Sequence, residues 1–150
     1  MQLYKSYLMD QDEMNLLLNA MDNENNEPIL QLTSKEIHNQ KIEALTELEL
    51  SNDMTVDFLT QLKEYIHVFE LPDIKFGSYI KWIPLTDPSK LKLTKGGIVC
   101  DIITADYGSV IKCKNYRNQF MFVAVDKVLL FRKLSNQEKI LISVSNYLNK

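Results

Sequence analysis

The sequence predicts an α+β protein in which a helical N-terminal region precedes a small antiparallel β-barrel and a C-terminal helix. Two observations carry this prediction. Up to Pro72 the apolar residues recur with the 3.6-residue spacing of helices, whereas beyond Pro72 they alternate with a period of two. The charge changes at the same place, because residues 1–73 carry a net charge of −11 and residues 74–150 one of +8. We therefore expect an acidic helical region over 1–72 and a basic β region over 73–150.

The first helix is expected over about residues 11–21. Asp10 is suited to cap its N-terminus, and acidic residues fill the first turn, where the helix dipole favours them. One apolar stripe follows the helical spacing and consists of Met14, Leu17, Leu18 and Met21. The polar run 22–28, which ends on a proline, predicts a break after this helix.

Two more helices are expected before the β region. Thr33 with Glu36 three residues later forms a capping-box pattern, which predicts a helix that reaches about Leu50. Asp53 is suited to cap the third helix, whose apolar face continues at helical spacing as far as Phe69.

The β region contains six short apolar segments separated by brief turns. We expect strands at 79–83, 90–93, 97–105, 109–115, 119–125 and 128–134. This pattern is typical of a small SH3-like or OB-like β-barrel. The pair 126–127 allows a tight connection between the last two strands, and Ser135 with Glu138 forms a second capping box that begins the terminal helix.

The hairpin around Gly108 decides the environment of both cysteines. The register that points Cys100 and Cys113 into one core sets them opposite each other and leaves 105–108 as a four-residue loop. The same register pairs Asp101 with Lys112. We therefore expect two buried, reduced thiols that pack as small apolar groups, with no disulfide between them.

Motifs of catalysis, metal binding or cofactor binding are not found. Two cysteines are too few for a disulfide framework or a zinc site, and His38 and His67 have no ligand-like or triad-like neighbours in the sequence. There is no glycine-rich phosphate loop and no nucleophile elbow. No apolar stretch has the length of a membrane span or the form of a signal peptide. We expect no enzyme activity, no cofactor, no small-molecule substrate and no membrane partner.

Lysine and arginine alternate with aromatic residues in the β region, which suggests a binding surface. The candidate contact residues for nucleic acid or a partner are Lys81, Trp82, Lys90, Lys92, Lys112, Lys114, Tyr116, Arg117, Arg132 and Lys133. Cations that hold phosphates and rings that stack on bases are the means by which small barrels bind single strands. The alternative is that any small barrel points its rings inward and its lysines outward. With only two arginines in the chain, we expect any nucleic-acid binding to be non-specific.

These features favour a non-catalytic interaction or structural module, a small subunit or adaptor that binds other protein subunits in a larger assembly. The ratio of 15 lysines to two arginines is typical of AT-rich coding, as in low-GC bacteria, many phages and many large DNA viruses, and a virus particle is one such assembly. The alternatives are a nucleic-acid-binding barrel with an acidic helical arm, and an enzyme whose site forms only across subunits. The expected location is the cytoplasm or a virus particle, without secretion.

Overall fold

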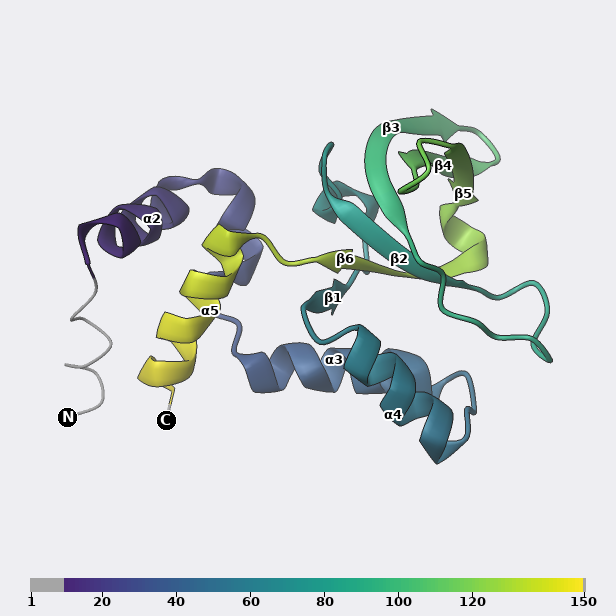
Figure 1. Ribbon diagram of the computed structural model, residues 1–150, viewed down its shortest axis with the longest axis horizontal. Helices are drawn as coiled ribbons and strands as arrows, with labels where there is room; N and C mark the ends of the chain where they lie inside the picture. The colour runs from purple at the N-terminus through teal and green to yellow at the C-terminus, as the bar shows by residue number, and fades with distance from the viewer. Residues whose placement is uncertain (1–9, 150) are drawn as a thin grey trace. The chain divides into compact units, whose positions relative to one another are not determined.

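The structure, a computed structural model, describes residues 10–149 (Figure 1). The described residues form two compact units: one combines residues 10–39 with residues 134–149, and the other holds residues 40–133. We call them the helical unit and the sheet unit. The helical unit is thus built from the two ends of the chain, whereas the boundary expected at Pro72 lies inside the sheet unit.

The helical unit contains two well-capped α-helices. Helix α2 (Gln11–Asp22) begins as expected, because the carboxylate of Asp10 accepts a hydrogen bond from the backbone N–H of Glu13. Helix α5 (Asn136–Leu148) begins with the expected capping box of Ser135 and Glu138, in which each side chain bonds the other's backbone N–H. The polar run after α2 is not an irregular break, because it forms a 3-10 helix, η1 (Glu24–Ile29), with its proline inside.

Helix α3 (Ser34–Thr46) contributes to both units. It starts where the capping pattern predicts, since the hydroxyl of Thr33 accepts a hydrogen bond from the N–H of Glu36. It ends at Thr46 and not at Leu50, and the backbone turns at Glu49, which has a φ of 54°.

The third predicted helix is partly wrong. Helix α4 (Asn52–Gln61) is capped by Ser51, whose hydroxyl accepts from the N–H of Met54, so Asp53 lies within the first turn. The chain then leaves the helix, and strand β1 (Tyr65–His67) pairs with the last strand of the sheet. The apolar residues of 65–69 fit a helical face, but aromatic and β-branched side chains also suit a strand, and pairing with β6 decides between the two.

The sheet unit is an open antiparallel sheet of six strands. Besides β1 they are β2 (Tyr79–Pro84), β3 (Gly97–Ala105), β4 (Gly108–Lys114), β5 (Phe120–Ala124) and β6 (Val128–Lys133). Their order is β1-β6-β2-β3-β4-β5, so that β1 and β5 are the two edges and the expected closed barrel is not observed. In Figure 1, β3 is strongly curved where it passes β4 and β5.

Apolar side chains cover both faces of the central strands. One core cluster lies on the concave side and draws residues from β2 to β6, including Ile80, Trp82, Val99, Ile111, Cys113, Val123 and Leu130. The second cluster lies on the other side and joins the sheet to α3 and α4 through Leu45, Phe58, Leu62, Tyr65, Ile83 and Phe131. Strands β2 and β6 are therefore buried on both faces, whereas β3, β4 and β5 bury one face and leave the other to solvent.

Two connections differ from the expectation. Residues 90–93 form no strand but belong to the long connection between β2 and β3, in which Leu91 and Leu93 pack against the second core cluster. The alternation of lysine and leucine therefore reflects leucines that pack against the core and lysines that face solvent, and not the pairing of a strand. The pair 126–127 lies in a 3-10 turn, η3 (Val125–Lys127), and β6 returns beside β2, so β5 and β6 do not form a hairpin.

The β3–β4 hairpin has the predicted register over most of its length. Asp101 lies opposite Lys112, and pairing continues to Ala105 opposite Gly108, so the loop has two residues where four were expected. A bulge between Val99 and Asp101 then shifts the ladder, which places Val99 opposite Cys113. Cys113 is buried, but Cys100 is exposed, and the prediction of two buried thiols is wrong for Cys100.

Candidate functional site

The solvent-facing side of β3, β4 and β5 carries the most distinctive surface of the sheet unit. Two rows of side chains cross these strands: Ile98, Lys114 and Phe120 in one, and Asp101, Lys112 and Phe122 in the next. Residues that oppose each other in an antiparallel sheet point to the same side. These six side chains therefore form one surface, which we call the outer face.

The apolar side chains of the outer face are unusually open to water. Phe120 is 53% exposed, Phe122 is 64% exposed and Ile98 is 48% exposed. Single exposed apolar residues are common, but a contiguous group on one face is typical of an interaction surface.

Lysine ammonium groups lie over one of these rings. The Nζ atom of Lys112 lies 4.3 Å from the ring centroid of Phe120, and that of Lys114 lies 5.2 Å from it. Each contact of this kind contributes about 0.5–1 kcal/mol at an exposed site. The arrangement holds two positive charges beside an aromatic surface that remains half open.

The β4–β5 turn adds a second ring with cations. The guanidinium carbon of Arg117 lies 5.4 Å from the ring centroid of Tyr116, and its Nε donates a hydrogen bond of 3.0 Å to the phenol oxygen. The Nζ atom of Lys95 lies 5.8 Å from the same centroid. The structure thus brings together four of the predicted contact residues, namely Lys112, Lys114, Tyr116 and Arg117.

The other predicted contact residues lie elsewhere. Trp82 is buried in the concave core, where its ring is closed to a partner. Lys81 points to the opposite side of β2, where its Nζ lies 5.2 Å from the ring centroid of Tyr65.

The remaining four are spread over two segments. Lys90 and Lys92 are exposed in the long connection between β2 and β3. Arg132 and Lys133 lie at the end of β6, and the Nζ of Lys133 lies 4.0 Å from a carboxylate oxygen of Glu64.

Family models, curated proteins and solved structures gave no match to this chain. Within residues 10–149, no helix combines the length and the apolar character that a membrane crossing requires.

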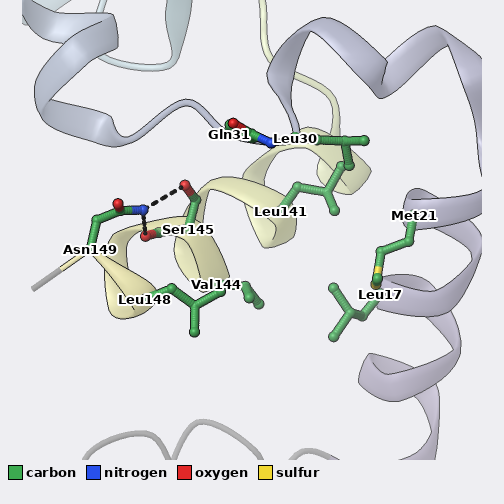
Figure 2. Close-up of a pocket in the computed structure, with 9 residues that line it drawn as sticks. All are labelled: Leu17, Met21, Leu30, Gln31, Leu141, Val144, Ser145, Leu148 and Asn149. Carbon is green, nitrogen blue, oxygen red and sulfur yellow. Dashed lines mark hydrogen bonds between the residues drawn. The ribbon is translucent and has the colours of Figure 1, made fainter.

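The helical unit presents an apolar pocket of about 350 Å³ between α2 and α5 (Figure 2). Its apolar lining consists of Leu17, Met21, Leu30, Leu141, Val144 and Leu148. At one end, the side-chain amide of Asn149 donates to the backbone oxygen of Ser145 at 2.8 Å. The polar groups of Asn149 and Ser145 therefore bond each other, and the open part of the pocket is lined by apolar side chains.

Histidine chemistry has little support in the described residues. The ring of His67 packs against Phe69 and Phe131, with centroids 4.3 Å and 5.6 Å away, and its Nδ1 is buried without a hydrogen-bond partner. Burial lowers the pKa of His67, although the charge of Glu47 acts in the opposite direction. Over the part of the chain that the structure describes, no group of three His, Cys, Asp or Glu residues is arranged to hold a metal ion.

Lys95, Ile98, Phe120 and Phe122 belong to this region but are not among the candidate contact residues predicted from the sequence. Lys95 lies outside a strand, and its position near Tyr116 depends on the path of the long connection. Ile98 lies two residues before Cys100, so a regular strand would put it on the predicted buried side, but the bulge between Val99 and Asp101 places Ile98 on the outer face. Only an extra residue in the strand pattern signals such a bulge.

Proposed function

We propose that the protein is a non-catalytic interaction module that serves as a small subunit or adaptor in a larger assembly. The observation that carries this proposal is the outer face, where Phe120, Phe122 and Ile98 lie exposed beside two lysines. Proteins seldom leave such a group in water unless a partner covers it. The unpaired edge of β5 borders this face and offers backbone groups to a further strand.

The apolar pocket of the helical unit supports the adaptor role. It is a second surface, built from different elements, and its apolar lining suits the apolar side chains of another protein subunit. Leu148 and Met21, at this pocket, are 64% and 56% exposed. A chain with one apolar surface on each unit has the means to join two partners.

We also propose that strands β2 to β6 belong to the SH3-like type of small barrel and not to the OB-like type. The first four pair in chain order and the last returns beside the first, with a 3-10 turn just before it. The OB type is instead a Greek-key barrel. The single concave core shared by these five strands supports the proposal.

The proposed location of the protein is the cytoplasm or a virus particle. This rests on the residue usage of the sequence, with its excess of lysine over arginine. Immunolocalisation in the native host, together with analysis of purified particles where these exist, is the measurement that checks it.

Co-purification with surface variants tests the adaptor role. Phe122→Lys places a charge on the outer face, Leu148→Lys places one at the pocket, and Val56→Lys does the same at an unrelated exposed site on α4. We expect each of the first two variants to lose a different set of proteins from a nuclease-treated extract of the native host. The control variant should retain the full set.

Quantitative mass spectrometry distinguishes the outcomes. If all three variants retain the proteins that the wild type retains, neither surface binds a protein and the adaptor proposal is wrong. If both test variants lose the same proteins, the two surfaces serve one partner.

A further inference from the structure

The rings and cations of the outer face alternate in a way that suits one class of partner. Phe120 and Phe122 are two residues apart on β5, so their side chains stand about 6.8 Å apart along the strand and on the same side of the sheet. Exposed rings on a sheet face are the stacking platforms on which proteins hold unpaired bases. Both rings here are more than half exposed.

Positive charge lies directly beside these rings. The Nζ atoms of Lys112 and Lys114 lie 4.3 Å and 5.2 Å from the ring centroid of Phe120. Around Tyr116, the β4–β5 turn adds Arg117 and the long connection between β2 and β3 adds Lys95. Asp101 is the acidic member of the two rows. Its carboxylate accepts a hydrogen bond of 2.8 Å from the N–H of Ile102, so it is held by the backbone of its own strand.

The charged side chains are unevenly distributed along the outer face. Asp106 lies in the loop of the β3–β4 hairpin, and the carboxylate of Asp126 lies close to Gly108 at the same end. The cations gather toward the opposite end of the hairpin, near the β4–β5 turn. A polyanion is therefore favoured at the turn end of the outer face and disfavoured at the hairpin loop.

We propose that the outer face binds single-stranded nucleic acid, with bases stacked on Phe120 and Phe122 and phosphates held by Lys112, Lys114 and Arg117. This inference goes beyond the proposed function, because it assigns a nucleic-acid partner to a surface whose protein partners are measured separately. Lysines act as point charges and supply no bidentate reading of bases, so the binding is not sequence-specific. An acidic protein segment would use the lysines without needing two rings at this spacing, which is why nucleic acid is favoured.

Fluorescence anisotropy of the full chain with labelled oligothymidylate and oligouridylate tests the proposal. For Phe122→Leu we expect affinity to fall about tenfold, which is about 1.4 kcal/mol, because one stacked base is lost. Phe69→Leu is the matched control, because Phe69 is 63% exposed and follows β1, the edge of the sheet opposite to β5. The control should bind as the wild type does.

The salt dependence tests the phosphate contacts. Between about 50 mM and about 200 mM salt, the double variant Lys112→Gln/Lys114→Gln should lower the slope of log K against log salt by about 1.4, or about 0.7 for each lost contact. The matched control, Lys90→Gln/Lys92→Gln, removes the same charge from the long connection and should change the slope less.

Two results would overturn the inference. One is the absence of binding by the full chain at the lower salt concentration, and the other is an equal effect of test and control variants. The adaptor proposal is tested independently, because it depends on which proteins the Phe122→Lys variant loses in the co-purification and not on oligonucleotide binding. Binding of a labelled acidic peptide without binding of either oligonucleotide would assign the outer face to a protein partner.

Discussion

At the scale of single residues, Cys113 shows most clearly what burial does to a titratable group. Its side chain is fully enclosed on β4, and this burial raises the pKa of its thiol from 9.0 to about 11, with a smaller contribution from Cys100. In the folded protein the thiol therefore keeps its proton at a pH where the unfolded chain has lost it. The free energy of unfolding should fall between pH 9 and about 11, by about 2–3 kcal/mol.

Cys113→Ala should remove this loss of stability at high pH, whereas Cys100→Ala, at the exposed bulge residue, should retain most of it. Burial also raises the pKa of Tyr65, to about 12, but that contribution is the same in all three proteins and cancels. Urea unfolding from about pH 8 to about pH 11 measures the difference. If the free energy of unfolding of Cys113→Ala falls with pH as steeply as that of the wild type, a group other than Cys113 causes the loss of stability at high pH.

At the scale of elements, one amide links three elements of the helical unit. The side-chain oxygen of Gln137 on α5 accepts hydrogen bonds from the amides of Asn23 and Asn26, at 2.9 Å and 3.1 Å. Asn26 is only 5% exposed, and its amide also donates to the backbone oxygen of Ala20. These bonds tie α5 to α2 and η1, which lie more than a hundred residues earlier in the chain.

Gln137→Ala should destabilise the helical unit by about 1–3 kcal/mol, because the buried amide of Asn26 loses an acceptor that water cannot readily replace. Gln137→Glu keeps an oxygen at the same position and should retain most of the stability. Thermal unfolding of the full chain, followed by circular dichroism near neutral pH, measures both. Equal melting temperatures for the two variants would show that the accepted bonds are not what stabilises this unit.

The same scale explains which elements the sequence could predict. The starts of α2 and α5 depend on Asp10 and on Ser135 with Glu138, which bond within three residues, so local pattern was sufficient. The bounds of β3 were also predicted correctly. Residues 65–67 became a strand because β6, some sixty residues later, pairs with them. A local pattern carries no information about such a partner.

The candidate site was predictable to the same extent. The alternation on β4 placed Lys112 and Lys114 on one side, but it left open whether the rings of β5 point inward or share the face of the lysines, as the structure has them. Trp82 was misplaced because β2 is buried on both faces, with Ile80 and Trp82 on one side and Ile83 on the other. Period-two alternation separates two faces of a strand, but it does not say whether either of them meets solvent.

At the scale of the whole molecule, the two divisions of the chain make different predictions about folding. The sequence places a boundary at Pro72, so the fragment 74–150 should fold alone. The compact units of the structure instead favour the fragment 40–133, because both core clusters of the sheet draw all their buried residues from that range. The shorter fragment lacks β1 and the two helices that cover Ile83 and Phe131.

We expect the fragment 40–133 to give a dispersed amide NMR spectrum and cooperative unfolding. The fragment 74–150 should give broad signals and bind a hydrophobic dye, because removal of Leu45, Phe58 and Leu62 exposes one side of its central strands. The full chain serves as the reference spectrum, since the amide signals of β3 to β5 should keep their positions in the longer fragment. If instead 74–150 unfolds cooperatively and 40–133 does not, the boundary lies at Pro72, and α3 and α4 do not belong to the fold of the sheet.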